Sequence, residues 1–132
     1  MTRPLSLPGS ILALCLASLS AVAATPNEMA AAYSAQAGTA ANAARGQEFF
    51  TNKHGKDWSC ASCHTSTPTA EGKHAATAKR IAPMAPVANA ERFTDNAKTE
   101  KWFRRNCNDV VGRECTPGEK ADVLAWLLSI QK

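Results

Sequence analysis

Two cysteines separated by two residues and followed directly by a histidine are the most constraining feature of this sequence, at Cys60-Ala61-Ser62-Cys63-His64. This spacing is typical of the attachment site of a c-type haem, where two thiols bond one edge of the porphyrin. The adjacent histidine then lies under the iron and donates a ring nitrogen to it. We therefore predict one covalently bound haem c, with Cys60 and Cys63 as attachment residues and His64 as the proximal iron ligand.

Two other sites share part of this pattern. A thioredoxin-like redox pair needs a βαβ context, and the chain has no strand pattern that would supply one. A zinc site needs a second pair of ligands at short spacing, whereas the remaining cysteines of the domain, Cys107 and Cys115, are too far apart in sequence. The haem interpretation is therefore favoured over both.

A thin hydrophobic core is the second constraint. The 132 residues allow one small domain and include only four Phe, three Trp and one Tyr. A chain this short buries little surface, so a bound cofactor or a cross-link is expected to add to its core. The formal net charge of +4 is spread along the chain and does not predict binding to nucleic acid.

The first residues have the pattern of an export signal. Arg3 is followed by an apolar run, and Ala21-Val22-Ala23 forms a small-x-small cleavage site. The run is too short for a comfortable membrane span, so no span is expected after cleavage. We predict a signal peptide over 1–23, a monohaem cytochrome domain over 24–132, and a location in the periplasm of a Gram-negative bacterium.

Helix signals account for the rest of the chain. Thr-Pro-x-Glu patterns at Thr25 and Thr116 predict helix starts, and further helices are expected over about 42–52 and from Thr94 or Asp95 to about Asn106. Residues 65–90 are rich in Pro, Ala, Gly and Thr and are expected to form a loop with at most one helical turn. The fold class predicted is all-α.

The order of these helices resembles class I cytochrome c, in which the N- and C-terminal helices cross beside the covalently attached haem. Gly46 would allow the backbones to approach closely at the crossing. Phe49, Phe50 and Trp126 are interpreted as core residues beside the haem.

Four residues are first candidates for the sixth iron ligand: Met29, Met84, His54 and His74. Met29 precedes the haem motif, where class I proteins do not take this ligand. Met84 lies between Pro83 and Pro86 in a stiff loop and is alternatively a packing residue. Both histidines lie in polar surroundings and are expected in solvent or near a haem propionate.

Several segments resemble the sphaeroides haem protein family of exported monohaem cytochromes c. They are CASCH at 60–64, IAPMAP at 81–86, ERFTD…EKW from residue 91, Arg105-Asn106-Cys107, and GRECTPGEKAD at 112–122. The most specific part is the RNC…GREC pair, which ordinary class I cytochromes lack. The resemblance covers most of the chain after the signal peptide.

This resemblance implies that Asn106 is the sixth ligand. It also implies a disulfide between Cys107 and Cys115, release of the asparagine on reduction, binding of O2 or NO at the iron, and electron donation by a dihaem cytochrome c. A hard amide oxygen suits Fe(III) better than Fe(II), which makes redox-linked release chemically sensible. Without the resemblance, the interpretation of Asn106 as a helix C-cap is favoured.

Three functions follow. The first is an electron-transfer cytochrome with a weak asparagine ligand that leaves to let O2 or NO bind, either as a ligand or as a substrate. The second is a plain electron shuttle with His64 and Met84 on the iron, and the third is a haem-free disulfide-bonded binding domain. Basic residues that could dock an acidic partner, or simply face solvent, are Lys98, Lys101, Arg104, Arg105 and Arg113.

Overall fold

The computed structural model describes residues 24–131. Its helices and strands are α1 (Pro26–Ala37), α2 (Ala43–Thr51), α3 (Ala61–His64), β1 (Gly72–Lys73), β2 (Arg80–Ile81), α4 (Asn96–Val110) and α5 (Pro117–Ser129). The predicted signal peptide lies outside this range. Within the part of the chain that is described, no helix is long and apolar enough to cross a membrane.

The two helices with Thr-Pro starts form as predicted. In α1, the Thr25 side chain accepts a hydrogen bond from the Glu28 backbone N–H, and the Glu28 carboxylate accepts one from the Thr25 N–H. In α5, Thr116 and Glu119 make the same reciprocal pair. Each capping box satisfies backbone donors that the helix itself leaves unpaired, so the starts are fixed locally.

Helix α4 is longer than the sequence suggests. It begins after Asp95, whose side chain accepts from the Lys98 N–H, and continues to Val110 instead of ending near Asn106. Its last turn is held by burial of Cys107 and Val110, contacts that polar local sequence does not reveal. Asn106 is therefore inside the helix, and its interpretation as a C-cap is wrong.

A small antiparallel hairpin was also missed. Gly72 pairs with Ile81 and Lys73 with Arg80, within the segment expected to be loop. Two-residue strands are too short to produce an alternating pattern, so sequence periodicity cannot predict them. The Arg80 guanidinium binds the Glu71 carboxylate in a bidentate ion pair beside this hairpin.

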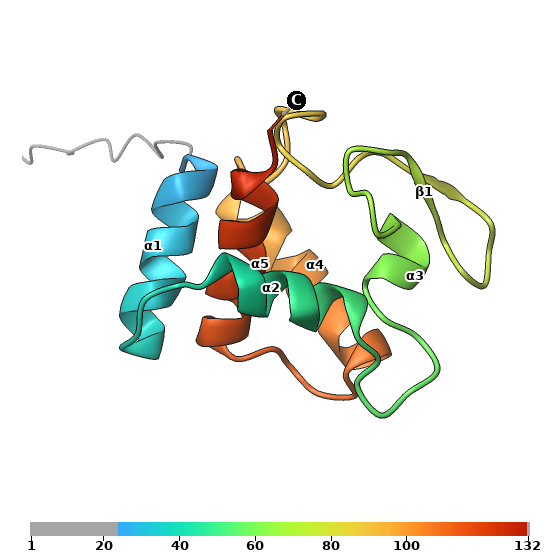
Figure 1. Ribbon diagram of the computed structural model, residues 1–132, viewed down its shortest axis with the longest axis horizontal. Coiled ribbons are helices and arrows are strands. Elements are labelled where there is room, and N and C mark those ends of the chain that lie inside the picture. Colours follow the sequence, from blue (N-terminus) through green and yellow to red (C-terminus); the bar gives the residue numbers. More distant parts are fainter. Residues whose placement is uncertain (1–23, 132) are drawn as a thin grey trace, which may run out of the picture.

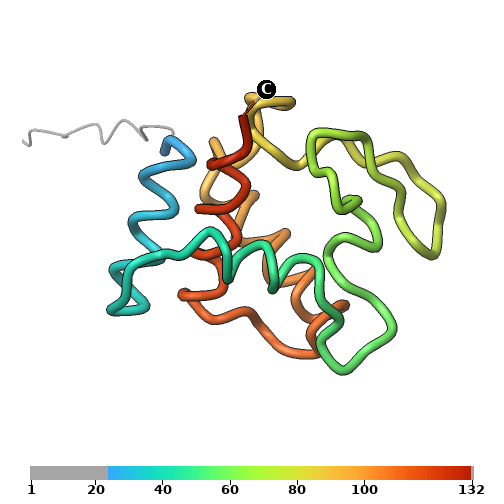
Figure 2. Tube along the Cα trace, in the orientation of Figure 1, coloured from blue at the N-terminus to red at the C-terminus, as the bar shows by residue number. Residues whose placement is uncertain are grey.

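Helix α5 is the centre of the molecule, with α1 and α2 packed against it and α4 behind it (Figure 1). The connection between α3 and α4 runs around the end of the molecule away from α1 (Figure 2). Two apolar clusters meet on α5. They consist of Met29, Tyr33, Ala121 and Leu124, and of Phe50, Val123, Trp126 and Leu127. The second cluster faces α3, and the mostly helical architecture agrees with the predicted fold class.

Helices α2 and α5 cross in direct backbone contact at Gly46. A Cβ atom at this position would lie 1.9 Å from the Asp122 carbonyl oxygen and 2.8 Å from the Val123 nitrogen. Only glycine fits so close an approach, as the sequence predicted. The crossing places Phe50, one turn further along α2, against Trp126 with ring centroids 5.0 Å apart.

A buried carboxylate stabilises the same crossing of α2 and α5. Asp122 is 7% exposed and accepts hydrogen bonds from the Asn42 backbone N–H at 2.6 Å and from the Arg45 guanidinium at 2.7 and 2.9 Å. Asn42 in turn caps α2 through the Arg45 N–H. A buried charge costs stability unless its oxygens are paired, and here both are.

We expect Gly46→Ala to lower the free energy of unfolding by about 2–4 kcal/mol, because the added methyl group meets backbone atoms that cannot turn away. Guanidinium denaturation of the holoprotein measures this loss. The matched control is Gly118→Ala, whose Cβ would sit at an ordinary 3.7 Å from Ala37. Equal, small effects of the two substitutions would contradict the close crossing.

A second prediction concerns acid stability. The hydrogen bond from Arg113 holds the pKa of Glu119 below its ordinary value, so the ionised carboxylate stabilises the fold at neutral pH. This contribution is present above the unfolded pKa of about 4.3 and is lost as the pH falls through the lower folded pKa. Glu119→Gln keeps the capping pattern and is expected to cost under about 1 kcal/mol at pH 7.

In urea titrations at several pH values, the difference between the wild type and Glu119→Gln should shrink toward zero as the pH falls through the folded pKa of Glu119, which lies below its ordinary value. Glu114→Gln is the control, because Glu114 is exposed and meets Arg104 only at 3.7 Å. A difference for Glu119→Gln that persists unchanged into acid would show that the charge is not its source.

Candidate haem site

The Cys-x-x-Cys-His motif forms a single helical turn. Within it, the Cys63 and His64 N–H groups both donate to the Cys60 carbonyl, at 3.2 and 3.0 Å. One turn of helix brings residues three and four apart to the same face, so Cys60, Cys63 and His64 are neighbours. The two cysteines are not joined in a disulfide.

Cys60 adjoins the Phe50–Trp126 cluster and is largely shielded from water. Burial raises the pKa of its thiol to about 11, so the sulfur is neutral at physiological pH. A thiol that stays protonated is a weak redox nucleophile. This environment therefore does not support the thioredoxin-like alternative.

The His64 imidazole is also neutral. Burial lowers its pKa to about 4, and the positive charge of Arg92 adds to the effect. Its Nδ1 atom is buried and has no hydrogen-bond partner among the described residues. A neutral ring is the form that binds a metal, and an unpaired buried nitrogen is costly unless the ring is held for another purpose.

The hairpin holds the motif from the other side. A Cβ atom on Gly72 would lie 2.1 Å from the Cys63 carbonyl oxygen, so β1 lies directly against α3. The Ala75 N–H donates to the Cys63 sulfur at 3.3 Å. The hairpin that the sequence did not predict thus fixes the second cysteine of the motif.

Half-buried apolar side chains pack against the Phe50–Trp126 cluster, which Cys60 of the motif also contacts; we call five of them the apolar shelf. They are Ala61, Met84, Phe93, Phe103 and Ile130. Such a surface, beside two thiols and a neutral imidazole, matches the flat apolar body of a porphyrin and its attachment chemistry. The residues present therefore fit a c-type haem.

Arg92 is a site residue to which sequence reasoning assigned no role. Its guanidinium donates to the Pro83 carbonyl at 2.9 Å and to the Ala82 carbonyl at 2.6 Å, and it is charged close to His64. It ties the loop that carries Met84 to the segment before α4. Its only sequence signal was its place in the Glu91-Arg92-Phe93 run.

The two other histidines have local partners. His54 Nε2 lies 2.6 Å from the Phe49 carbonyl and its ring packs on the Phe49 ring. His74 Nδ1 accepts from the Ala76 and Thr77 N–H groups within its own turn. Neither ring is arranged as an iron ligand.

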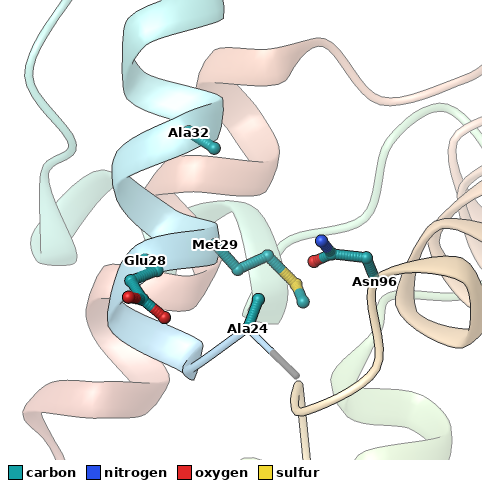
Figure 3. A pocket seen from close by; sticks show the side chains of 5 residues that line it. All are labelled: Ala24, Glu28, Met29, Ala32 and Asn96. Carbon is teal, nitrogen blue, oxygen red and sulfur yellow. The ribbon is translucent and has the colours of Figure 1, made fainter. Parts of the chain in front are cut away.

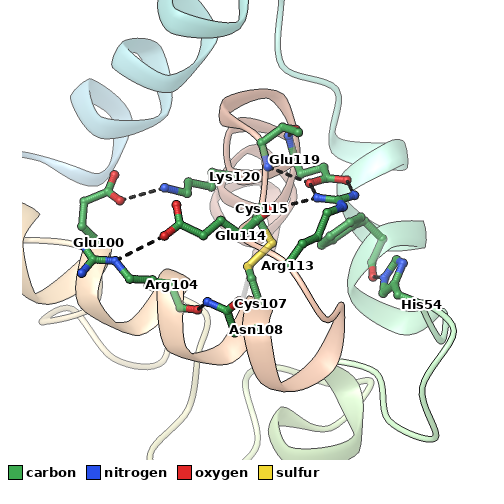
Figure 4. Close-up of a disulfide and its surroundings, with 12 residues drawn as sticks. His54, Glu100, Arg104, Cys107, Asn108, Arg113, Glu114, Cys115, Glu119 and Lys120 are labelled. Atoms are coloured by element: carbon green, nitrogen blue, oxygen red, sulfur yellow. Dashed lines mark hydrogen bonds and ion pairs between the residues drawn. A yellow bond between two sulfur atoms is a disulfide. The ribbon is translucent and has the colours of Figure 1, made fainter.

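Asn106 is half-buried on α4, one turn after Phe103 of the apolar shelf. None of the described residues makes a hydrogen bond with its side-chain amide, whereas the nearby Asn108 amide donates to the Arg104 carbonyl. Cys107, the next residue, is joined to Cys115 with Cα atoms 5.6 Å apart, as the family resemblance implied (Figure 4). With both sulfurs in a disulfide, this pair is not available to zinc.

The end of α4 is held by two further contacts. The Lys56 ammonium, from the loop before the haem motif, donates to the Asn108 carbonyl at 3.1 Å. Across the disulfide loop, Arg113 binds the Glu119 carboxylate at 2.7 Å (Figure 4). The part of α4 that follows Asn106 is thus held by the disulfide and by Lys56.

Met84 is the other candidate ligand. It packs against the Phe50–Trp126 cluster, and its backbone N–H donates to the Pro68 carbonyl at 2.9 Å. Its place on the apolar shelf matches the packing role predicted as its alternative.

Two open pockets lie elsewhere on the described surface. One, of about 360 Å³, lies between the start of α1 and Asn96 at the start of α4, with the Met29 thioether at its base (Figure 3). The other, of about 640 Å³, lies around Arg45, Lys53 and His54. Neither includes the haem motif or Asn106.

Comparisons with known proteins agree with this site. A protein-family model described as a domain of unknown function (DUF1924) matches residues 36–127. The cytochrome c-type protein SHP of Cereibacter sphaeroides is 51% identical over 107 residues, which cover 78% of this chain and 82% of that protein.

Solved structures agree in fold as well. A structure of oxidised SHP, described as an oxygen-binding cytochrome c, has a TM-score of 0.73 at 51% identity and covers 78% of this chain and 95% of its own. A solution structure of cytochrome c'' from Methylophilus methylotrophus, presented as giving insights into haem-ligand detachment, has a TM-score of 0.69 at 38% identity, with 81% and 94% covered.

These matches confirm the class I cytochrome c-like fold and the prediction of one covalently bound haem. They also exclude the haem-free binding domain. The chain belongs to the DUF1924 family, and it belongs to the family of c-type cytochromes that includes SHP.

Proposed function

We propose that this protein is a periplasmic monohaem cytochrome whose sixth ligand, Asn106, is held weakly and leaves on reduction, so that O2 or NO can bind the haem iron. The observation that carries the proposal is the position of Asn106. Its amide has no hydrogen bond to any described residue and lies one turn from Phe103 on the apolar shelf.

Cys60 and Cys63 would attach the haem, and His64 would be its proximal ligand. Their single helical turn presents both sulfurs and the imidazole together. The low pKa of His64, caused first by burial, keeps the ring free of a competing proton. When bound, the haem supplies a one-electron couple and an iron position that a small diatomic molecule can occupy.

Asn106 fits the role of a removable ligand. An amide oxygen is a hard and neutral donor, which suits Fe(III) better than Fe(II). The disulfide at Cys107 and the Lys56 contact with the Asn108 carbonyl hold the backbone directly after it, so its side chain can change position without unwinding the helix. The ligand detachment described for cytochrome c'' and the oxygen binding described for SHP both support such behaviour.

Methionine ligation is the second candidate. Met84 lies on the same apolar shelf as the residues around the haem motif, and Arg92 holds its loop through the Ala82 and Pro83 carbonyls. In this form the protein would be a plain electron shuttle with His64 and Met84 on the iron. Ligation of the iron by the Met84 sulfur would then be expected to produce a low-spin spectrum.

Residues 1–23 would direct export as a cleaved signal peptide, which gives the proposed periplasmic location. The electron donor would be another exported cytochrome, as the family resemblance implies for a dihaem cytochrome c. The domain itself would comprise residues 24–132. Small diatomic molecules and this donor are the partners that the proposal requires.

The first test replaces Asn106 by Ala in the holoprotein. The wild-type ferric protein is expected to be high spin, and its ferrous form is expected to bind NO. Asn106→Ala is expected to change the spectrum of the ferric protein and to leave that of the ferrous protein unchanged. Optical spectra of both oxidation states measure this. Asn108→Ala is the matched control on the same helix, because its amide is bound to the Arg104 carbonyl.

A different set of spectra would contradict asparagine ligation. A low-spin ferric spectrum with a methionine-to-iron band, lost in Met84→Ala and unchanged in Asn106→Ala, would establish the shuttle instead.

The second test removes the disulfide with Cys107→Ser and Cys115→Ser together. Because the cross-link closes a short loop, we expect a loss of about 2–3 kcal/mol in the free energy of unfolding. The end of α4 would also loosen, so the ferric spectrum should become heterogeneous. Denaturant unfolding and ferric spectra measure the two effects. Loss of stability with an unchanged spectrum would mean that the bridge does not position Asn106.

A further inference from the structure

Three exposed cations and a tryptophan lie together on the outer side of α4. We call Lys98, Lys101, Trp102 and Arg105 the basic face of α4. Trp102 is 44% exposed, one of two large hydrophobic residues in the described chain that are so accessible. The Arg105 guanidinium lies over its ring, 5.6 Å from the centroid.

Two other charged residues of α4 are paired. Glu100 meets Lys120 at 2.7 Å, and Arg104, which borders the basic face, meets Glu114 at 3.7 Å (Figure 4). Arg113, another basic residue considered for docking, is occupied by Glu119. Of the five basic residues predicted as a docking group, only the three on this face make no ion pair with a described residue.

The basic face borders the proposed ligand position. Trp102 and Asn106 are four residues apart, and in a helix of 3.6 residues per turn such residues share one side. Phe103, next to Trp102, belongs to the apolar shelf. A partner seated on Trp102 would therefore lie over the edge of the haem site and not at a remote surface.

The chemistry of the face defines its partner. Exposed tryptophan and arginine are typical of the centres of protein interfaces, and surrounding lysines steer an oppositely charged surface. Two carboxylates lie on or near this face: the Asp95 side chain caps the start of α4, and Asp109 is exposed one turn after Arg105 on the same side of the helix. The three cations still leave the face with a net positive charge. Resting on the function proposed above, we propose that the basic face of α4 is the docking surface for an acidic electron-donor protein.

In the docked complex one electron passes from the donor to the haem. The donor is oxidised by one electron and the iron is reduced from Fe(III) to Fe(II), with no proton or bond transferred. Asn106, adjacent to Arg105 in sequence, lies at the border between the docked protein and the site that the electron reaches.

The experiment uses the holoprotein and reduced flavodoxin, a strongly acidic one-electron donor protein, as the probe. Stopped-flow spectroscopy at several ionic strengths measures the second-order rate of haem reduction. Titration with oxidised flavodoxin, followed by calorimetry, measures binding without electron transfer.

Lys98→Glu, Lys101→Glu and Arg105→Glu together are expected to lower both the rate and the affinity at least tenfold at low ionic strength. The loss should largely disappear at high salt, because screening weakens charge steering. The matched control reverses Lys53, Lys73 and Lys79, which are exposed and lie outside the face. It changes the net charge equally and is expected to lower the rate less than threefold.

Trp102→Gln is expected to lower the affinity at every ionic strength, because it removes contact area and no charge. Equal losses in the two triple variants would overturn the proposal, since net charge alone would explain them. A second result would also overturn the proposal: the basic-face variants bind flavodoxin normally but no longer bind phosphatidylglycerol vesicles. The face would then be a membrane-binding surface. Unchanged ferric and ferrous spectra of every variant show that the haem site is intact.

The docking experiment and the test of Asn106 as an iron ligand can fail independently of each other. Asn106 is unchanged in each docking variant, so normal ligand behaviour with no loss of docking would refute only the docking surface.

Discussion

The backbone contact between Gly46 of α2 and Asp122 of α5 is the constraint on which the rest of the structure depends. It brings Phe50 against Trp126 and Leu127, and Cys60 packs against that cluster. The Asn42 and Arg45 hydrogen bonds to Asp122 hold the crossing at one angle and one register. A chain with so few aromatic residues has little other core, so the haem motif and the apolar shelf rely on this single crossing.

The opposite side of the site depends on a different kind of restraint. Helix α4 contributes Phe103 to both apolar clusters, and covalent and polar links hold its end. The Cys107–Cys115 disulfide joins its end to the start of α5, and Lys56 joins that end to the loop before the haem motif. One side of the site is thus built by apolar packing and the other by links at a helix end.

Much of the fold was predictable because its signals are local. Capping boxes at Thr25 and Thr116 and the Asn42 cap depend on residues three apart, so the sequence predicts these helix starts correctly. The end of α4 was predicted too early, because its last turn is held by burial of Cys107 and Val110. The hairpin was missed because β1 and β2 are stabilised by pairing with each other and by contact with α3, not by local preference.

The sequence by itself determined the haem chemistry, because Cys60, Cys63 and His64 are adjacent and need only one turn of helix to act together. It also pointed to Asn106 through the family resemblance. Only the tertiary structure decided which side chains surround these groups: Arg92 beside His64, the shelf around Phe50, and the pairing of Arg104 and Arg113 that leaves the basic face of α4 open. The physical reason is that burial and ion pairing depend on residues distant in sequence, which only the completed fold brings together.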